Sequence, residues 1–177
     1  MRITDPPIAM KNGIAFRQLE VTDIDAWYAY LSNPKAIEHT SWAIDSAEGL
    51  KPVIAAYLSS DESSSIRFAV STKANGPLLG TAGFQNISAP HRTAEIAYDF
   101  APENWGKGLA TACCQALVEW GFESRRYVRI QAVALDTNLA SVRVLEKCGF
   151  SLEGKLRSFR IVRGVSRDFW LYAKTAP

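Results

Sequence analysis

Residues 94–111 read AEIAYDFAPENWGKGLAT, and the order of elements that they predict decides the fold of this chain. The residue types predict a strand over Ala94–Phe100, and Pro102 with the glycines behind it predicts a turn. A helix is expected over residues 109–123, followed by a further strand over Tyr127–Leu135. A strand, a helix and a strand joined in this way form a parallel, right-handed crossover. The sheet is therefore expected to contain one parallel pair of strands.

Strand and helix signals on both sides of this stretch complete the prediction. Further strands are expected over residues 14–20, 66–71, 78–84, 150–161 and 165–174. Further helices are expected from Thr22 as N-cap, from Pro34, from Asp45 or Ser46, and over residues 138–147 before the glycine stop at Cys148-Gly149. Arg163-Gly164 predicts a hairpin between the last two strands. The fold class is α/β (α+β): one domain over residues 1–177, with a mixed, mostly antiparallel seven-stranded sheet flanked by helices.

The bulk composition is that of an ordinary globular protein. The chain has 177 residues, of which 47% are hydrophobic and 21% charged, so it can form one domain with a sizeable core. A net charge of +2 does not require a nucleic acid or a membrane as partner. The three cysteines have no CxxC or metal-type spacing, and the N-terminus has no apolar run for a signal peptide or membrane span. We therefore expect buried thiols, no metal, and a cytoplasmic location.

The turn at Trp105–Thr111 is the first candidate for a ligand site. Its glycines allow a sharp turn and let backbone N–H groups approach a ligand without an intervening Cβ atom. The helix that follows begins with unpaired N–H donors and a partial positive charge, which favour a phosphate. The alternative is a turn whose glycines serve chain reversal alone, and GxG does not decide between the two. A P-loop motif is absent, and Thr111 stands where GxGxxG needs its third glycine.

Two blocks of this sequence, taken together, resemble the GNAT N-acetyltransferases. Glu95–Phe100, Pro102 and Trp105–Thr111 are similar to the cofactor-binding core of that superfamily, and Asn138–Phe150 (NLASVRVLEKCGF) is similar to its second signature. The opening FRQLEVTDIDAWYAYLSNP and the ending GFSLEGKLRSFRIVRGVSRDFWLYAK resemble its ribosomal-protein-alanine (Rim-type) branch. The resemblance covers nearly the whole chain. It implies the acyl-CoA N-acyltransferase fold, with acetyl-CoA (coenzyme A) as cofactor.

The resemblance also implies cofactor-binding positions. The family pattern Q/R-x-x-G-x-G/A falls on residues 105–110, with Trp105 in place of Gln or Arg, and backbone amides there would hold the pyrophosphate. In the family the fourth and fifth strands splay apart, and a freed N–H of the fourth strand polarises the thioester carbonyl. Asn138 and Ser141 would reach the pantetheine and the thioester sulfur. The implied cofactor-binding residues are Tyr98, Asp99, Phe100, Trp105, Gly106, Lys107, Gly108, Leu109, Ala110, Thr111, Asn138 and Ser141.

One departure from the family concerns the proton donor to the leaving thiolate. Many GNAT enzymes carry a tyrosine four residues before the glycine of the GF pair, and this chain has Leu145 there. Ser141 is the nearest polar substitute, acting directly or through a water. The alternative is a helix-end serine that bonds its own backbone. A thiol of pKa near 8.5 leaves readily at neutral pH, so a weak donor would suffice.

The acceptor amine must be neutral in order to attack. At pH 7 deprotonation costs about 1.2 kcal/mol for an α-amino group and about 4.6 kcal/mol for a lysine amine. Glu95 is the candidate base, working through a water, and the alternative is an ion pair with Arg92 or Arg129. The second-line candidates are Asp99, Asp168, His39 and His91.

The predicted activity is transfer of an acetyl group from acetyl-CoA to a primary amine by direct attack. The Rim-type resemblance favours a protein or peptide N-terminal α-amine. The alternatives are a small amine (an aminoglycoside, polyamine or amino-acid derivative) and a non-catalytic acyl-CoA-binding module.

Charge near the coenzyme A phosphates would come from Lys107, Arg143 and Lys147. Four aromatic residues would pack in the core or line the acceptor groove: Trp27, Tyr28, Tyr30 and Trp42. A monomer or homodimer is expected.

Overall fold

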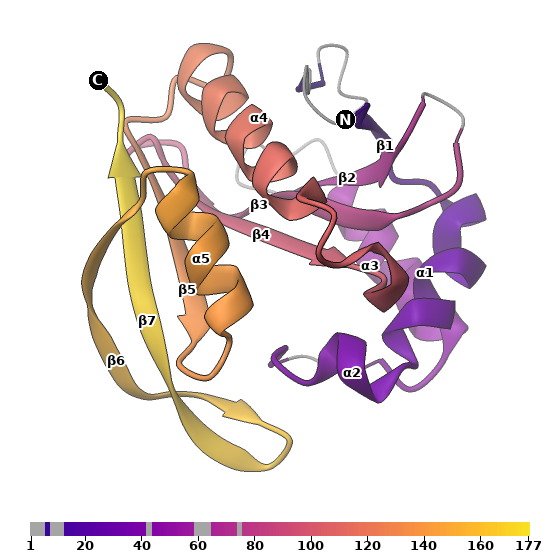
Figure 1. Cartoon of the computed structure of the whole chain (residues 1–177). Coiled ribbons are helices and arrows are strands. Elements are labelled where there is room, and N and C mark those ends of the chain that lie inside the picture. Colours follow the sequence, from indigo (N-terminus) through magenta and orange to yellow (C-terminus); the bar gives the residue numbers. More distant parts are fainter. Residues whose placement is uncertain (1–5, 8–12, 42–43, 59–64, 74–75) are drawn as a thin grey trace.

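The computed structural model describes residues 6–7, 13–41, 44–58, 65–73 and 76–177, and its strands form one seven-stranded sheet (Figure 1). The strands are β1 (Ala15–Gln18), β2 (Ile66–Ser71), β3 (Gly80–Ser88), β4 (Thr93–Phe100), β5 (Arg129–Leu135), β6 (Ser151–Val162) and β7 (Val165–Thr175). The helices are α1 (Ile24–Leu31), α2 (Pro34–Ile37), α3 (Leu50–Tyr57), α4 (Leu109–Glu123) and α5 (Leu139–Lys147). Short 3-10 turns, η1 (Val21–Asp23), η2 (Ala47–Gly49) and η3 (Pro102–Asn104), precede α1, α3 and α4.

The sheet has the order β1-β2-β3-β4-β5-β7-β6 and is mostly antiparallel. Of its described strand pairs, β4 and β5 run parallel, as the 94–135 crossover predicted. Helices α4 and α5 pack on one face and share a core with the strands, while α1 and α3 form a second core on the opposite side (Figure 1). The predicted mixed sheet flanked by helices is confirmed.

The helical segment after β1 begins with the 3-10 turn η1 at Val21, earlier than the sequence predicted, and α1 itself begins at Ile24, because Glu20 and Asp23 form the cap. Thr22 lies inside η1 and is not the N-cap. The carboxylate of Asp23 instead accepts a hydrogen bond of 2.9 Å from the Glu20 amide, and it also receives the Arg17 guanidinium at 2.6 Å. Asp23 is buried, so the ion pair with Arg17 holds the start of the helix against the end of β1.

The third strand is longer than predicted and is irregular at its far end. Its register with β4 shifts between Gln85 and Ser88, and Asn86 has a left-handed backbone (φ 50°). An asparagine tolerates this conformation better than most residues do, and an extra residue there bends the strand. The sequence predicted a strand over residues 78–84, whereas β3 continues to Ser88.

The remaining predictions of local structure are confirmed. Gly149 has φ 77° and ends α5, and the hairpin turn Arg163-Gly164 has φ 51° and 78°, as a type I′ turn requires. The three cysteines, Cys113, Cys114 and Cys148, are buried and free. Within the described part of the chain, no helix is both long enough and apolar enough to cross a membrane.

Candidate active site

The centre of the sheet opens between β4 and β5. The two strands pair from Thr93↔Arg129 to Glu95↔Gln131, yet β4 continues to Phe100 and β5 to Leu135. This is the splay that the family resemblance implied. It leaves main-chain groups at the middle of a sheet without a neighbouring strand, so a ligand can pair with them.

The alternation along β4 shows which groups face this opening. The Ala101 amide donates to Leu79 on the β3 side, whereas the Arg92 carbonyl accepts from Val128 on the β5 side. Successive residues of a strand point their N–H and C=O groups to opposite sides, so the even-numbered residues of β4 turn theirs toward β5. The last ladder pair, Glu95↔Gln131, engages the Ile96 amide, so the Tyr98 amide is the first backbone donor available to a thioester carbonyl or a pantetheine.

The glycine turn ends beside the same opening. Gly106 and Gly108 have φ of 73° and 75°, and a Cβ added at Gly106 would meet no atom within 4 Å. The Ala112 amide makes the first bond of α4, to the Gly108 carbonyl at 3.0 Å, and no amide of residues 106–111 donates a hydrogen bond within the described structure. An open row of unpaired N–H donors at a helix N-terminus fits a diphosphate.

Trp105 fixes this turn against β4. Its indole Nε1 donates to the Phe100 carbonyl at 2.8 Å, and the ring is 49% exposed. The indole thereby occupies the last carbonyl that faces the opening. Trp105 therefore holds the turn in place through its side chain, and the unpaired amides lie in the backbone that follows.

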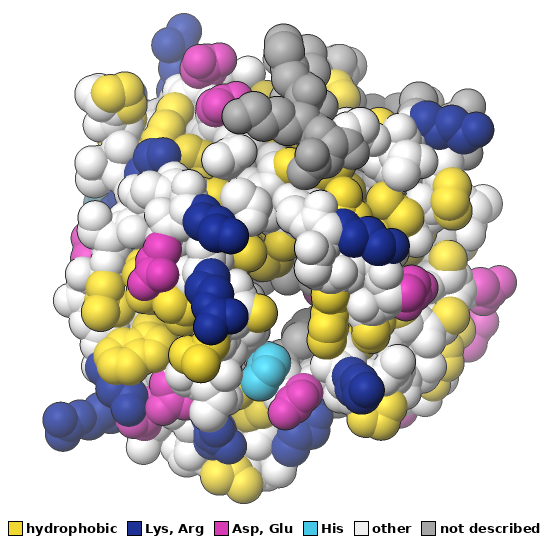
Figure 2. Space-filling model, in the orientation of Figure 1, with side chains coloured by type: hydrophobic (Ala, Val, Ile, Leu, Met, Phe, Trp, Pro, Cys, Tyr) yellow, Lys and Arg dark blue, Asp and Glu magenta, His cyan; other side chains and the backbone are white. Residues whose placement is uncertain are grey.

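Basic side chains lie on two sides of the opening. Lys107, Arg143 and Lys147 are all exposed, and Lys107 reaches the Asn104 side chain at 3.4 Å. Figure 2 shows a hollow near the middle of this face, between α5 and the α1–α2 segment, with Lys and Arg side chains on both of its sides. This distribution of charge suits an anionic ligand.

On the α4 and α5 face, the structure brings Tyr98 to Ser141. Asn138 caps α5 by accepting from the Ser141 amide at 3.1 Å, so the serine does not serve its own helix end. The Ser141 side chain lies near the Tyr98 phenol and lowers its pKa. Burial raises the pKa of Tyr98 by more than the Ser141 side chain lowers it, so the phenol keeps its proton at any physiological pH. Leu145 is buried in the core.

Glu95 lies on the opposite face and is saturated by donors. Its Oε1 accepts from Gln85 at 2.7 Å and from Arg160 at 3.3 Å; its Oε2 accepts from Asn86 at 3.2 Å and from Gln131 at 3.5 Å. The side chain is buried, and four donors fill the acceptor sites of a carboxylate.

The predicted ion-pair partners of Glu95 were wrong. Arg129 pairs with Glu153 at 2.5 Å, and Arg92 is exposed in the β3–β4 turn, so the partner is Arg160 of β6. The sequence could not show this, because β6 reaches β4 only through the curvature of the β6–β7 hairpin.

Asp99 forms a second buried network on this face. Its carboxylate accepts from Arg67, from the Tyr30 hydroxyl, and from Thr81 at 2.8 Å. Arg67, Tyr30 and Thr81 are all buried. Coming from α1, β2, β3 and β4, these residues fix the first helix beside the opening. Asp99 is therefore held as the counter-ion of Arg67.

The other predicted candidates fall in different places. Asp168 accepts from the Ser158 amide at 2.8 Å and from Lys155 at 3.0 Å on the β6–β7 hairpin, which lowers its pKa. His91 is exposed in the turn between β3 and β4, at the far end of β4 from the opening. His39 is half-buried after α2.

The four aromatic residues predicted for the core or the acceptor groove also lie in different environments. Trp27 and Tyr30 are buried, and the Tyr28 hydroxyl donates to the Asp45 carbonyl at 3.0 Å. Trp42 lies outside the described residues.

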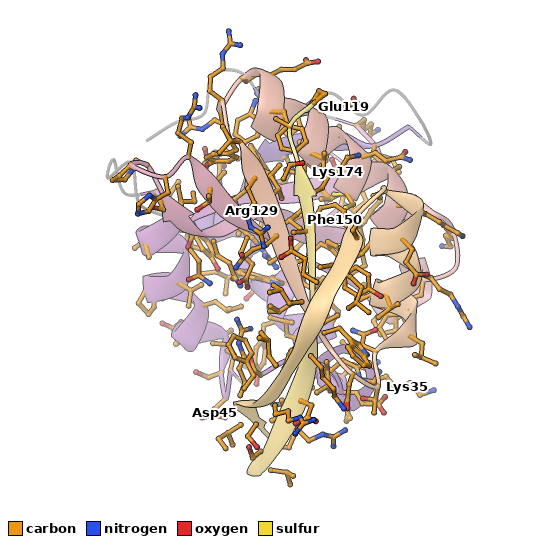
Figure 3. The ribbon with its side chains drawn as sticks, turned by 90° about the vertical axis from the view of Figure 1, so that its left-hand side faces the viewer. Lys35, Asp45, Glu119, Arg129, Phe150 and Lys174 are labelled. Carbon is orange, nitrogen blue, oxygen red and sulfur yellow. The ribbon has the colours of Figure 1, made fainter. Side chains whose placement is uncertain are left out.

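A hydrogen-bonded contact joins the two sides of the opening at its outer end. Arg163, in the β6–β7 turn, donates to the Ile37 carbonyl at 2.6 Å and to the Thr40 hydroxyl at 3.2 Å. In the side view of Figure 3, Lys35 and Asp45 lie at the end of the molecule where this hairpin turns. We call this contact the Arg163 bridge. It links the C-terminal hairpin to the N-terminal helices.

Sequence reasoning missed three of these features: the Tyr98 phenol, the Arg160 partner and the Arg163 bridge. One of them had a usable signal. Alternation along 94–100 places Tyr98 on the same face as Ile96, opposite Glu95, so its side chain belongs with α5. The two arginine contacts join residues at least 65 positions apart and have no local signature.

Comparison with known proteins finds relatives along nearly the whole chain. Residues 14–151 match the family model described as an acetyltransferase (GNAT) domain. The uncharacterized N-acetyltransferase YoaA of Bacillus subtilis is 30% identical over 97% of this chain and 98% of its own. Spermidine N(1)-acetyltransferase of Escherichia coli is 29% identical over 58% of this chain and 54% of its own.

Solved structures share the fold. The spermidine N-acetyltransferase of Vibrio cholerae, in complex with CoA and spermine, superposes with a TM-score of 0.83 and 23% identity, covering 93% of this chain and 96% of that one. The ribosomal-protein-S5-alanine acetyltransferase of Vibrio fischeri superposes with a TM-score of 0.83 and 21% identity, covering 97% of each chain.

Proposed function

Since this chain belongs to the GNAT acetyltransferase family, whose acetyl donor is acetyl-CoA, we propose that it acetylates the α-amine of a peptide or protein N-terminus. The observation that carries this proposal is the splay of β4 from β5 beside an open row of amides at the start of α4. The amine attacks the thioester directly, and no side chain is acylated. A cytoplasmic location remains a prediction from the sequence.

Backbone groups bind the acetyl donor. Amides of Gly106 to Thr111 bind the diphosphate, with Lys107 adding charge from the surface. The main-chain groups of β4 beyond the ladder receive the pantetheine, and the Tyr98 amide donates to the thioester oxygen as negative charge develops there. Acetyl-CoA supplies the acetyl group, and the chain positions it by these contacts.

The ion pairs on the face of the sheet opposite α4 and α5 favour an α-amine over a polyamine as acceptor. A polycation is held by several uncompensated carboxylates, but Glu95 is paired with Arg160 and Asp99 with Arg67. An α-amine is about 85–90% protonated at pH 7 and loses its proton at a cost of only about 1.2 kcal/mol. Binding an α-amine therefore does not require unpaired carboxylates in the site. The spermidine acetyltransferases among the relatives make a small amine the alternative.

An acceptor panel tests the proposal. We expect kcat/KM for a peptide with a free N-terminus to exceed, by about tenfold or more, the values for the same peptide with a blocked N-terminus and an internal lysine, for spermidine and for an aminoglycoside. Release of coenzyme A thiol is the measurement. A higher kcat/KM for spermidine would refute the α-amine and establish the small-amine alternative.

Glu95 is the proposed base, acting through a water that takes the place of its longest contact, the 3.5 Å bond from the Gln131 amide. We expect Glu95→Gln to lower kcat/KM at pH 7 by about 10- to 100-fold and to recover activity toward pH 9, because the amine then loses its proton unaided. A purely structural loss would not recover. Glu153→Gln, which breaks the exposed ion pair with Arg129, is the control and should keep the wild-type pH profile. Full activity of Glu95→Gln on lysine-type acceptors from pH 6 to 9 would contradict the assignment.

Ser141 is the proposed proton donor to the leaving thiolate, with Tyr98 positioning its hydroxyl. Ser141→Ala is expected to lower kcat about 10- to 100-fold, and Tyr98→Phe less, while KM for acetyl-CoA changes by less than about threefold. Ser151→Ala, at an exposed serine that begins β6, is the control. A rise in KM with unchanged kcat would show that the pair binds the cofactor and does not donate a proton.

A further inference from the structure

A cavity lies at the end of the sheet opposite the splayed strands, where the β3–β4 turn meets the loop between α4 and β5. It has a volume of about 220 Å³, roughly the space of seven liquid waters. Its lining residues are Ile87, Ala89, Arg92, Arg125 and Tyr127. Two of the five side chains are therefore permanently cationic, and none of the five is acidic.

Tyr127 lines this cavity, and its hydroxyl has no hydrogen-bond partner of normal geometry among the described residues. The residue is 5% exposed, and its hydroxyl oxygen is buried without a hydrogen-bond partner among the described residues. An edge-to-face contact with Phe84, at 5.3 Å between ring centroids, holds the ring in place. Burial raises the pKa of Tyr127, and the Arg125 guanidinium beside it offsets part of that rise, so the phenol stays a neutral donor. A buried, unpaired hydroxyl costs about 1–3 kcal/mol.

The two arginines are held near this hydroxyl with their charge uncompensated. Arg125 lies over the Trp120 ring at 5.7 Å, and neither Arg92 nor Arg125 forms an ion pair within the described residues. Arg92 has a left-handed backbone (φ 51°), fixed by bonds of its amide to Ala89 and of its carbonyl to Val128. This backbone conformation is strained in a residue other than glycine, and Arg92 adopts it in the tight turn between β3 and β4.

We propose that this cavity binds a small oxyanion, a phosphate or a carboxylate group, between Arg92 and Arg125 with the Tyr127 hydroxyl as a third donor. Guanidinium groups pair with both kinds of anion through their planar set of N–H donors. The site is distinct from the amides of the glycine turn: α4 has 15 residues and spans about 22 Å, with the turn at its start and this cavity beyond its end. The inference does not depend on the proposed acetyl transfer.

The test measures stabilisation by inorganic phosphate and, separately, by malonate, against potassium chloride of equal ionic strength. Saturating coenzyme A is present so that the glycine turn is already filled. A site that binds the folded state raises the melting temperature with ligand concentration, which yields Kd. We expect saturable stabilisation by phosphate, malonate or both, and the stronger of the two identifies the anion. Stabilisation no greater than that by chloride would overturn the proposal.

Variants locate the site. Arg125→Gln, Arg92→Gln and Tyr127→Phe should each raise Kd at least about fivefold. Arg126→Gln removes the same charge from the next residue, which is exposed and not part of the lining, and should leave Kd unchanged. Tyr127→Phe should also melt no lower than wild type without added anion, because it deletes an unsatisfied hydroxyl. Unchanged Kd in both Arg92→Gln and Arg125→Gln would overturn the site.

Discussion

Replacing Gly108 by glutamate should weaken acetyl-CoA binding by about 100-fold or more. Gly108 is exposed at the start of α4 with φ 75°, among the amides assigned to the diphosphate. A carboxylate about 5 Å from a phosphate charge costs on the order of 3 kcal/mol at an effective dielectric constant of about 20. Isothermal titration with coenzyme A gives the affinity, and circular dichroism shows that the variant folds.

The control separates charge from backbone strain. Gly108→Asn also adds a side chain, but it is neutral, and asparagine tolerates the left-handed conformation. Its affinity should stay within about tenfold of wild type. If Gly108→Glu bound coenzyme A like wild type, the diphosphate would lie elsewhere. If both variants lost binding equally, the shape of the turn, and not its charge, would be decisive.

Removing the Asp99 carboxylate should cost about 3–5 kcal/mol of unfolding free energy, the largest stability effect expected in this chain. Asp99→Asn leaves the Arg67 guanidinium buried without its counter-ion, and it also weakens the bond to the Tyr30 hydroxyl. Urea denaturation monitored by tryptophan fluorescence measures the loss.

Two further variants show whether the unpaired charge is the cause. Tyr30→Phe removes a single hydrogen bond to Asp99 and should cost only about 1 kcal/mol. The double variant Arg67→Met, Asp99→Leu removes both charges and should recover most of the loss, because the desolvation cost disappears with them. A loss below about 1 kcal/mol in Asp99→Asn would mean that Arg67 finds water or another partner.

The sequence predicted the order of the elements well because their signals are local. Glycine ended α5 at Gly149, Arg163-Gly164 formed the hairpin turn, and the 94–135 crossover formed the parallel pair. The errors came where a longer-range contact competed with a local one. A 3-10 turn at Val21–Asp23 precedes α1, because Arg17 and the Glu20 amide both bind Asp23, and β3 extends beyond Phe84 through a bulge that residue patterning does not reveal.

The site was predicted better in its backbone than in its side chains. The glycine turn has a local signature, because its glycines allow the left-handed backbone, whereas the splay was expected from the family resemblance alone. The environment of Glu95 could not be predicted, because Arg160 reaches it from a strand that is not adjacent to β4 in the sheet. The Ser141–Tyr98 contact depends on how closely α5 packs on the sheet.

The Arg163 bridge gives the opening between β4 and β5 a second boundary. At one end the strands are joined by their ladder, which stops at Glu95↔Gln131. At the other end Arg163 ties the hairpin to Ile37 and Thr40. An acceptor that reaches the opening therefore meets a boundary at each end, and breaking the Arg163 bridge would widen the route for bulkier acceptors.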